Sequence, residues 1–139
     1  MSQASDPARM HPLVTVQFCA ADRRYEPLGP LEVRYAVELP AGQVVRAVER
    51  SILWYTEGKG EEDIGVHSFE RLTDRGTATA AGGSFGCRLP ASPLSYEGVI
   101  VKIRWCVRVR LFFDAGRDFV SEHVFDLGDV PAAPYPNRS

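Results

Sequence analysis

The chain has 139 residues, of which 45% are hydrophobic and 24% charged, and its formal net charge is −2. These values are typical of one globular domain that is large enough to bury a core. Because the net charge is slightly negative and no apolar run reaches membrane-spanning length, we expect neither a nucleic-acid partner nor membrane insertion.

The chain begins with polar residues and then alternates. Residues 1–12 show no periodicity and no apolar stretch of the signal-peptide kind, which predicts a flexible N-terminal segment. The sequence LVTVQFC (13–19) predicts a first strand. After a loop that contains two prolines and a glycine, LEVRYAVEL (31–39) alternates cleanly between apolar and polar residues and predicts a second strand.

Residues 44–58 are harder to interpret. The first part could form a helical turn, whereas SILWYT is rich in β-branched and aromatic residues and favours a strand. In a regular strand, Arg46 and Arg50 would share a face with Val48, Ile52 and Trp54. A β-bulge would resolve this conflict, because one extra residue exchanges the two faces. The conformation of residues 44–51 stays open at this point.

The remaining pattern predicts four more strands and no long helix. They cover residues 64–72, 84–89, 99–113 and 119–127, and they are separated by turns rich in glycine and polar residues. Seven strands at this spacing predict an all-β fold, a two-sheet immunoglobulin-like β-sandwich of about seven strands.

Residues 99–113 alternate without interruption. The odd positions from Val99 to Phe113 are apolar and predict a core face, whereas the even positions carry four cations. These cations are Lys102, Arg104, Arg108 and Arg110. Alternate residues of a strand lie about 7 Å apart, within the Debye length of about 8 Å, so the cations repel one another unless anions lie beside them.

The turn at residues 114–118 decides which anions those are. A loop with an even number of residues would bury Glu122 and Asp126, which is costly. An odd number places both acids beside the cations, and Gly116 suits the left-handed position of such a hairpin. We therefore predict an odd-length loop and a contact from Glu122 to Arg108 or Arg110. Glu49 and Glu57 are the expected anions on the other side of the strand.

The charged face has two interpretations. It is either balanced within the sheet, or it binds an anionic partner. The candidate partner-binding residues are Lys102, Arg104, Arg108, Arg110, Tyr96 and Glu122.

The last residues, 129–139, predict a proline-rich, extended tail, in which PAAPYP (131–136) fits the PxxP pattern that aromatic grooves recognise. Residues 13–128 constitute the expected folded domain. Its cysteines, Cys19, Cys87 and Cys106, are odd in number and form no CxxC pair, which predicts reduced thiols and a cytoplasmic location.

Few residues suggest chemistry. His67, His123 and a cysteine could in principle bind zinc, but no pair has the spacing of metal ligands. Ser95 and Ser121 lack the context of a nucleophilic serine. We expect no catalytic residue, no metal and no cofactor. His123 shares its parity with core residues and is expected to be a buried histidine with one hydrogen bond.

The segment GSFGCRLPASPLSYEGVIVKIRWCVRVRLFF resembles the N-terminal domain of the arrestin family. The matching positions are Phe85, Leu89, Pro90, Pro93, Ser95, Tyr96, Glu97, Gly98, Arg104 and Trp105. The resemblance extends loosely over residues 13–128 and is specific only over 84–111. It implies an arrestin-like sandwich and an adaptor-like character without catalysis. Arrestins normally have two such sandwiches, and this chain has room for one.

Two hypotheses about function follow. The first is a non-enzymatic protein-interaction module, adaptor-like or scaffold-like, that binds a protein partner or a second copy through a sheet edge or through the charged face. The alternative is a sandwich domain that binds a carbohydrate or an anionic small molecule. A pocket lined by Trp54, Tyr55 or Tyr96 would favour the alternative, and a flat face with paired charges would favour the first.

Overall fold

The computed structural model describes residues 5–6, 11–73 and 82–129, and within them the chain forms ten strands and no helix. The strands are β1 (Ser5–Asp6), β2 (Leu13–Phe18), β3 (Arg24–Tyr25), β4 (Pro30–Pro40), β5 (Val45–Gly58), β6 (Ile64–Thr73), β7 (Gly82–Arg88), β8 (Tyr96–Glu97), β9 (Val101–Phe113) and β10 (Asp118–Leu127). The seven predicted strands correspond to β2, β4, β5, β6, β7, β9 and β10. The other three have two residues each, which is too short to produce a periodic signal.

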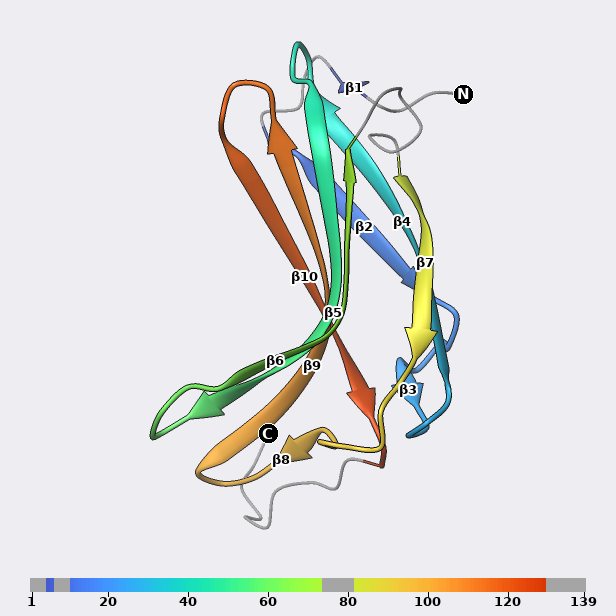
Figure 1. Cartoon of the computed structure of the whole chain (residues 1–139), viewed down its shortest axis with the longest axis vertical. Coiled ribbons are helices and arrows are strands. Elements are labelled where there is room, and N and C mark those ends of the chain that lie inside the picture. Colours follow the sequence, from blue (N-terminus) through green and yellow to red (C-terminus); the bar gives the residue numbers. More distant parts are fainter. Residues whose placement is uncertain (1–4, 7–10, 74–81, 130–139) are drawn as a thin grey trace.

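The strands form two sheets that face each other as a sandwich (Figure 1). In the small sheet, β4 lies between β2 and β7, and β1 pairs in parallel with the end of β4. The large sheet has the order β3-β10-β9-β5-β6, with β8 beside β9. The predicted all-β, two-sheet sandwich is therefore confirmed.

The core lies between the sheets, where the odd residues of β9 point inward. Trp105, Val107, Val109 and Leu111 are fully buried. The Trp105 indole packs against Phe125 and donates a hydrogen bond of 2.7 Å to the carbonyl oxygen of Pro93. The prediction that Val99 begins this core face was wrong. Val99 is 43% exposed, because residues 98–100 form the turn between β8 and β9.

Residues 45–58 form a strand, which answers the question left open for 44–51. The register with β9 shifts between Val45 and Ala47, as the predicted bulge requires, and Arg46 is exposed. Arg50 nevertheless faces inward and is only 9% exposed. A second register shift, between Ile52 and Leu53, occurs in the pairing with β6.

The turn between β9 and β10 has the predicted odd length. The amide of Phe113 donates to the carbonyl of Arg117 at 2.9 Å, which leaves a loop of residues 114–116. Gly116 has a φ of 93°, in the left-handed region. Even residues of β10 therefore lie opposite even residues of β9, and the inner face of β10 places Phe125 and Leu127 in the core.

Candidate interaction surface

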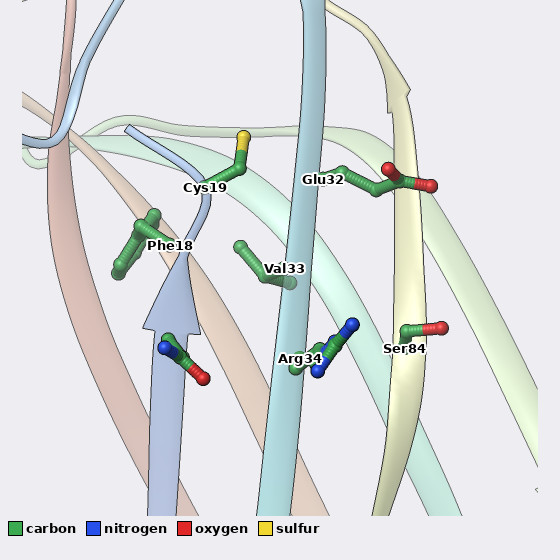
Figure 2. A pocket seen from close by; sticks show the side chains of 7 residues that line it. Phe18, Cys19, Glu32, Val33, Arg34 and Ser84 are labelled. Atoms are coloured by element: carbon green, nitrogen blue, oxygen red, sulfur yellow. The ribbon is translucent and has the colours of Figure 1, made fainter. Parts of the chain in front are cut away.

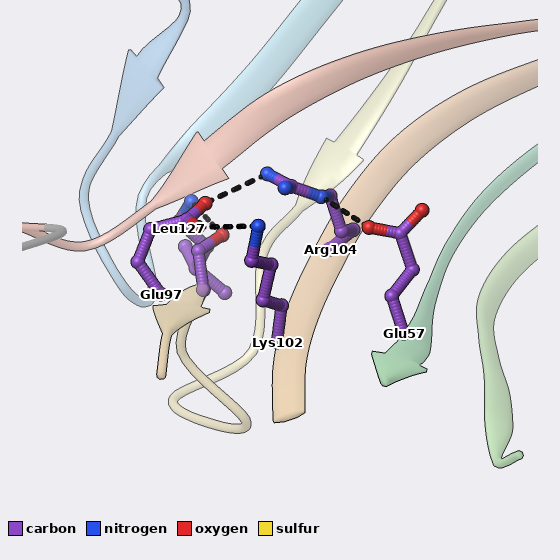
Figure 3. A network of polar contacts seen from close by, with 6 residues as sticks. Glu57, Glu97, Lys102, Arg104 and Leu127 are labelled. Carbon is purple, nitrogen blue, oxygen red and sulfur yellow. Dashed lines mark hydrogen bonds and ion pairs between the residues drawn. The ribbon is translucent and has the colours of Figure 1, made fainter. Parts of the chain in front are cut away.

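The outer face of the large sheet carries the four predicted cations, and each of them contacts a carboxylate. Arg104 forms two ion pairs, at 2.8 Å to Glu57 and at 2.9 Å to Glu97. The Lys102 ammonium lies 3.3 Å from the same Glu97 (Figure 3). The hydrogen bond that Arg104 donates to Glu57 stabilises the charged guanidinium and raises the pKa of Arg104.

The other two arginines pair with β10. Arg108 lies opposite Glu122 and contacts it at 2.7 Å, and Arg110 contacts Asp118 at 2.6 Å. The predicted contact between Glu122 and Arg108 is thus confirmed. These pairs are partly exposed, so each contributes little to stability, but together they neutralise the repulsion along the strand.

Two of the predicted anions also lie beside cations other than the four on β9. Glu49 lies opposite Arg110 but forms its ion pair with Arg71 of β6, at 2.7 Å. Asp126 lies beside Arg24 of β3. The two carboxylates that form ion pairs with Arg104 are those of Glu57 and Glu97. Sequence reasoning missed Glu97 as a counter-ion because it lies on the two-residue strand β8. The available signal was its place in the Pro93–Gly98 segment of the arrestin-like motif.

An apolar row crosses the same outer face. Val124, Cys106, Leu53 and Val66 lie side by side on β10, β9, β5 and β6. Cys106 and Leu53, in the middle, are fully buried, and burial raises the pKa of the Cys106 thiol to about 12. The face is therefore not a uniform charged stripe, because this apolar row separates Lys102 and Arg104 from Arg108 and Arg110.

Strand β6 forms one edge of the large sheet, and none of the described strands pairs with its outer side. Three large apolar side chains of β6 are exposed on the outer face: Ile64 at 53%, and Val66 and Phe69 at 57% each. Unpaired N–H and C=O groups along a long apolar edge are the usual template for adding another strand. The sequence could not identify this edge, because strand order is a property of the tertiary structure.

The edge of β7 faces β6 across the sandwich. Unlike the edge of β6, it is contacted by side chains from the other sheet. Arg50 of β5 donates a hydrogen bond to the carbonyl of Ser84 at 3.2 Å, pairs with Glu70 of β6, and lies 4.8 Å from the centre of the Phe85 ring. A ring nitrogen of His67 lies 2.8 Å from the carbonyl oxygen of Arg88. Arg50 and His67 thus join the two sheets and occupy two backbone carbonyl oxygens of β7, those of Ser84 and Arg88.

Tyr96 is exposed on β8, opposite Ile103, and its ring lies over Gly98 so closely that a side chain at Gly98 would collide with it. Tyr96 directly precedes Glu97, which pairs with Lys102 and Arg104. The charged candidates and Tyr96 therefore gather at one end and along the middle of the large sheet, whereas the exposed apolar residues lie at the edge formed by β6.

Shallow hollows lie on the surface of the described residues, and three of them bear on ligand binding. One of about 490 Å³ lies against β2, β4 and β7, beside Cys19, Glu32, Arg34 and Ser84 (Figure 2). The others, of about 460 and 560 Å³, lie beside the β9–β10 turn and beside β3. None of the three is lined by Trp54, Tyr55 or Tyr96, the aromatic residues whose pocket would favour ligand binding.

The histidines and cysteines do not form a metal site in the part of the chain that the structure describes. His123 is half-buried, lies 2.6 Å from the hydroxyl of Ser121, and has a lowered pKa because of burial and the nearby Arg23. The three cysteines are free. No described helix is long and apolar enough to cross a membrane.

Comparison with known proteins identifies the fold. No family model and no curated protein matches the chain. The solved structure of Spo0M, a sporulation control protein from Bacillus subtilis, matches with a TM-score of 0.61 and 12% identity, over 86% of this chain and 50% of that chain. Superoxide reductase (neelaredoxin) from Ignicoccus hospitalis matches with a TM-score of 0.49 and 11% identity, over 85% of this chain and 80% of that chain. The chain thus spans half the length of the Spo0M structure and shares its β-sandwich fold.

Proposed function

We propose that this domain is a non-enzymatic protein-interaction module, adaptor-like or scaffold-like, and that its binding surface is the free edge of β6 with the adjoining outer face. The observation that carries the proposal is the combination, on one edge strand, of an unpaired side and three exposed apolar residues. An extended segment that pairs with such an edge gains main-chain hydrogen bonds, and alternate side chains provide specificity.

The paired charges support this choice over an anion site on the charged face. Binding an anion at Arg104 would require the guanidinium to give up Glu57 or Glu97, and both contacts are shorter than 3 Å. Arg108 and Arg110 each face a carboxylate as well. We therefore assign Lys102, Arg104, Arg108, Arg110 and Glu122 to holding the sheet together, and Tyr96 to the margin of the surface.

The arrestin-like resemblance supports the adaptor-like character. Its characteristic connection is built as a structural unit here, because the Ser95 hydroxyl accepts a hydrogen bond of 2.8 Å from the Leu127 amide and Trp105 bonds to Pro93. The three free cysteines support a cytoplasmic location, as reduced thiols are usual there.

The alternative function, binding of a carbohydrate or an anionic small molecule, has less support. It requires a concave site with exposed aromatic residues and convergent polar groups. The hollow against β2, β4 and β7 has polar groups such as Glu32 and Arg34, but its aromatic residue, Phe18, belongs to the buried core.

The test is affinity purification of the full chain with mass spectrometry, compared between two double variants. We expect Val66→Lys/Phe69→Lys to lose the co-purified proteins, because lysine on an edge strand opposes strand addition. The matched variant Arg108→Gln/Arg110→Gln changes the charged rows without touching the edge and should retain them. Thermal melting verifies that both are folded. If the edge variant retains the co-purified proteins and the arginine variant loses them, the binding site lies on the charged face and the proposal is wrong.

A further inference from the structure

We infer that the occupant of the β6 edge is the β6 edge of a second copy of this chain, paired antiparallel about a two-fold axis. The two large sheets then join into one continuous sheet. This inference rests on the proposed function, since it names the partner that the edge binds.

The backbone of β6 has the necessary groups in the necessary places. The amide of Thr56 donates to the carbonyl of Asp63 at 3.0 Å, which defines Asp63 as a residue whose backbone faces β5. Backbone groups of an antiparallel strand point alternately to either side. The register shift at Ile52/Leu53 resets this alternation, so the groups of Ile64, Val66, Phe69 and Arg71 point away from β5.

One two-fold register matches all of these residues. If Val66 faces Phe69 of the second copy, symmetry brings Phe69 opposite the second Val66, and Ile64 opposite the second Arg71. Each pair consists of two residues whose backbone groups point outward and whose side chains lie on the outer face. The two Val66–Phe69 pairs each combine an aromatic with a β-branched side chain, a favourable combination across strands.

The bulge makes this self-pairing possible. In a regular strand, odd-numbered and even-numbered side chains lie on opposite faces. If the numbers of two facing residues added to an odd total, an inner side chain would therefore face an outer one. The extra residue at His67 exchanges the faces halfway along β6, so a pairing with the odd total of 135 matches the faces along the whole strand. In that register His67 faces Ser68 of the second copy next to the axis.

The charges at the two ends of β6 are also self-complementary. Glu61, Glu62 and Asp63 precede the strand and are exposed, whereas Arg71 lies near its other end. Antiparallel pairing places the acidic turn of each copy near Arg71 of the other, which also pairs with Glu49 of its own chain at 2.7 Å. The inward carboxylate of Glu70, which would oppose pairing if it were isolated, is neutralised by Arg50.

Sedimentation equilibrium of the full chain tests the association. We expect a dimer whose dissociation constant rises about 100-fold in Val66→Lys/Phe69→Lys, because two apolar cross-strand pairs are lost and lysines face each other. The matched control Val120→Lys/Val124→Lys alters exposed valines of the same outer face on β10, away from the edge, and should dimerise as the unchanged chain does.

Disulfide trapping tests the register in a Cys19→Ser background. Val66→Cys/Phe69→Cys should form an intermolecular disulfide, since the two positions face each other across the interface at a separation that a disulfide can span. Ile64→Cys/Phe69→Cys is two residues out of register and should not.

The outcomes separate this inference from the proposed function. A folded chain that stays monomeric at submillimolar concentration, or a dimer that the edge lysines leave intact, overturns self-pairing. The affinity purification then still tests the proposed function independently. A dimer that is trapped through positions 64 and 69 but not 66 and 69 overturns the register.

Discussion

Arg108 and Glu122 lie directly opposite each other on β9 and β10, and their side chains form an ion pair of 2.7 Å on the outer face of the large sheet. This relationship depends on the three-residue turn that joins the strands. One residue more or fewer would move Glu122 to the core side, where an unpaired carboxylate is costly.

The turn itself can be tested at Gly116. Its φ of 93° strains any β-branched residue, and a Cβ there would meet nothing within 4 Å, so the effect of a substitution comes from the backbone alone. We expect Gly116→Val to reduce the free energy of unfolding by about 1–2 kcal/mol, measured by urea denaturation. Gly116→Asn is the control and should cost less, because asparagine adopts the left-handed region more readily. A Gly116→Val variant as stable as the unchanged chain would contradict this explanation of the turn.

We predict that the buried Arg50 stabilises the fold through the packing of its aliphatic stem as well as through its charge. Arg50→Ala removes packing against Phe85 and leaves the carbonyl of Ser84 without its donor, so we expect a loss of roughly 2–4 kcal/mol in the free energy of unfolding. Arg50→Met retains the apolar volume and should lose less, since apolar replacement of buried ion pairs is often tolerated. Hydrogen exchange should show faster exchange of β7 amides in both variants. Equal stabilities for the alanine and methionine variants would assign the whole effect to the charge.

Ser95 is predicted to be structural. Its buried hydroxyl accepts the Leu127 amide at 2.8 Å, and Ser95→Ala leaves that amide without a partner, which costs about 1–3 kcal/mol. Ser121→Ala, at a serine whose hydroxyl contacts His123, should have a smaller effect in the same thermal denaturation. If both variants melt at the same temperature, the connection before β9 does not depend on this hydrogen bond.

Alkaline pH should destabilise the fold through Cys106. Burial raises the pKa of its thiol from 9.0 to about 12, so the folded state retains the proton when the unfolded state has lost it. The contribution of this thiol to the free energy of unfolding is complete below pH 9 and is lost as the pH rises from 9 to 12. The free energy of unfolding of Cys106→Ala should therefore fall less steeply over that range than that of the unchanged chain. Parallel curves for the two proteins would show that this thiol does not titrate differently on unfolding.

Thiol labelling gives a second readout of the same burial. At pH 8 a disulfide reagent should modify the exposed Cys19 rapidly and Cys106 only after denaturant is added. Rapid modification of Cys106 in the folded chain would show that the apolar row on the outer face opens readily.

Local alternation determined much of this protein. The seven long strands, the inward residues of β9 from Trp105 to Phe113, the odd turn and the contact between Glu122 and Arg108 all follow from the two-residue period of a strand and from the cost of burying a carboxylate. These features depend on neighbours in the sequence or on one hairpin, so composition and parity suffice to predict them.

Tertiary structure decided the rest. The sequence places Arg50 among apolar residues but cannot show that Glu70, Ser84 and Phe85 from two other strands surround it. Nor does it show that Glu97 approaches Arg104, or that β6 lies at an edge with Val66 and Phe69 exposed. The apolar pattern of β6 reads like that of a half-buried strand, and only the order of strands in the sheet determines which side of it is left without a partner.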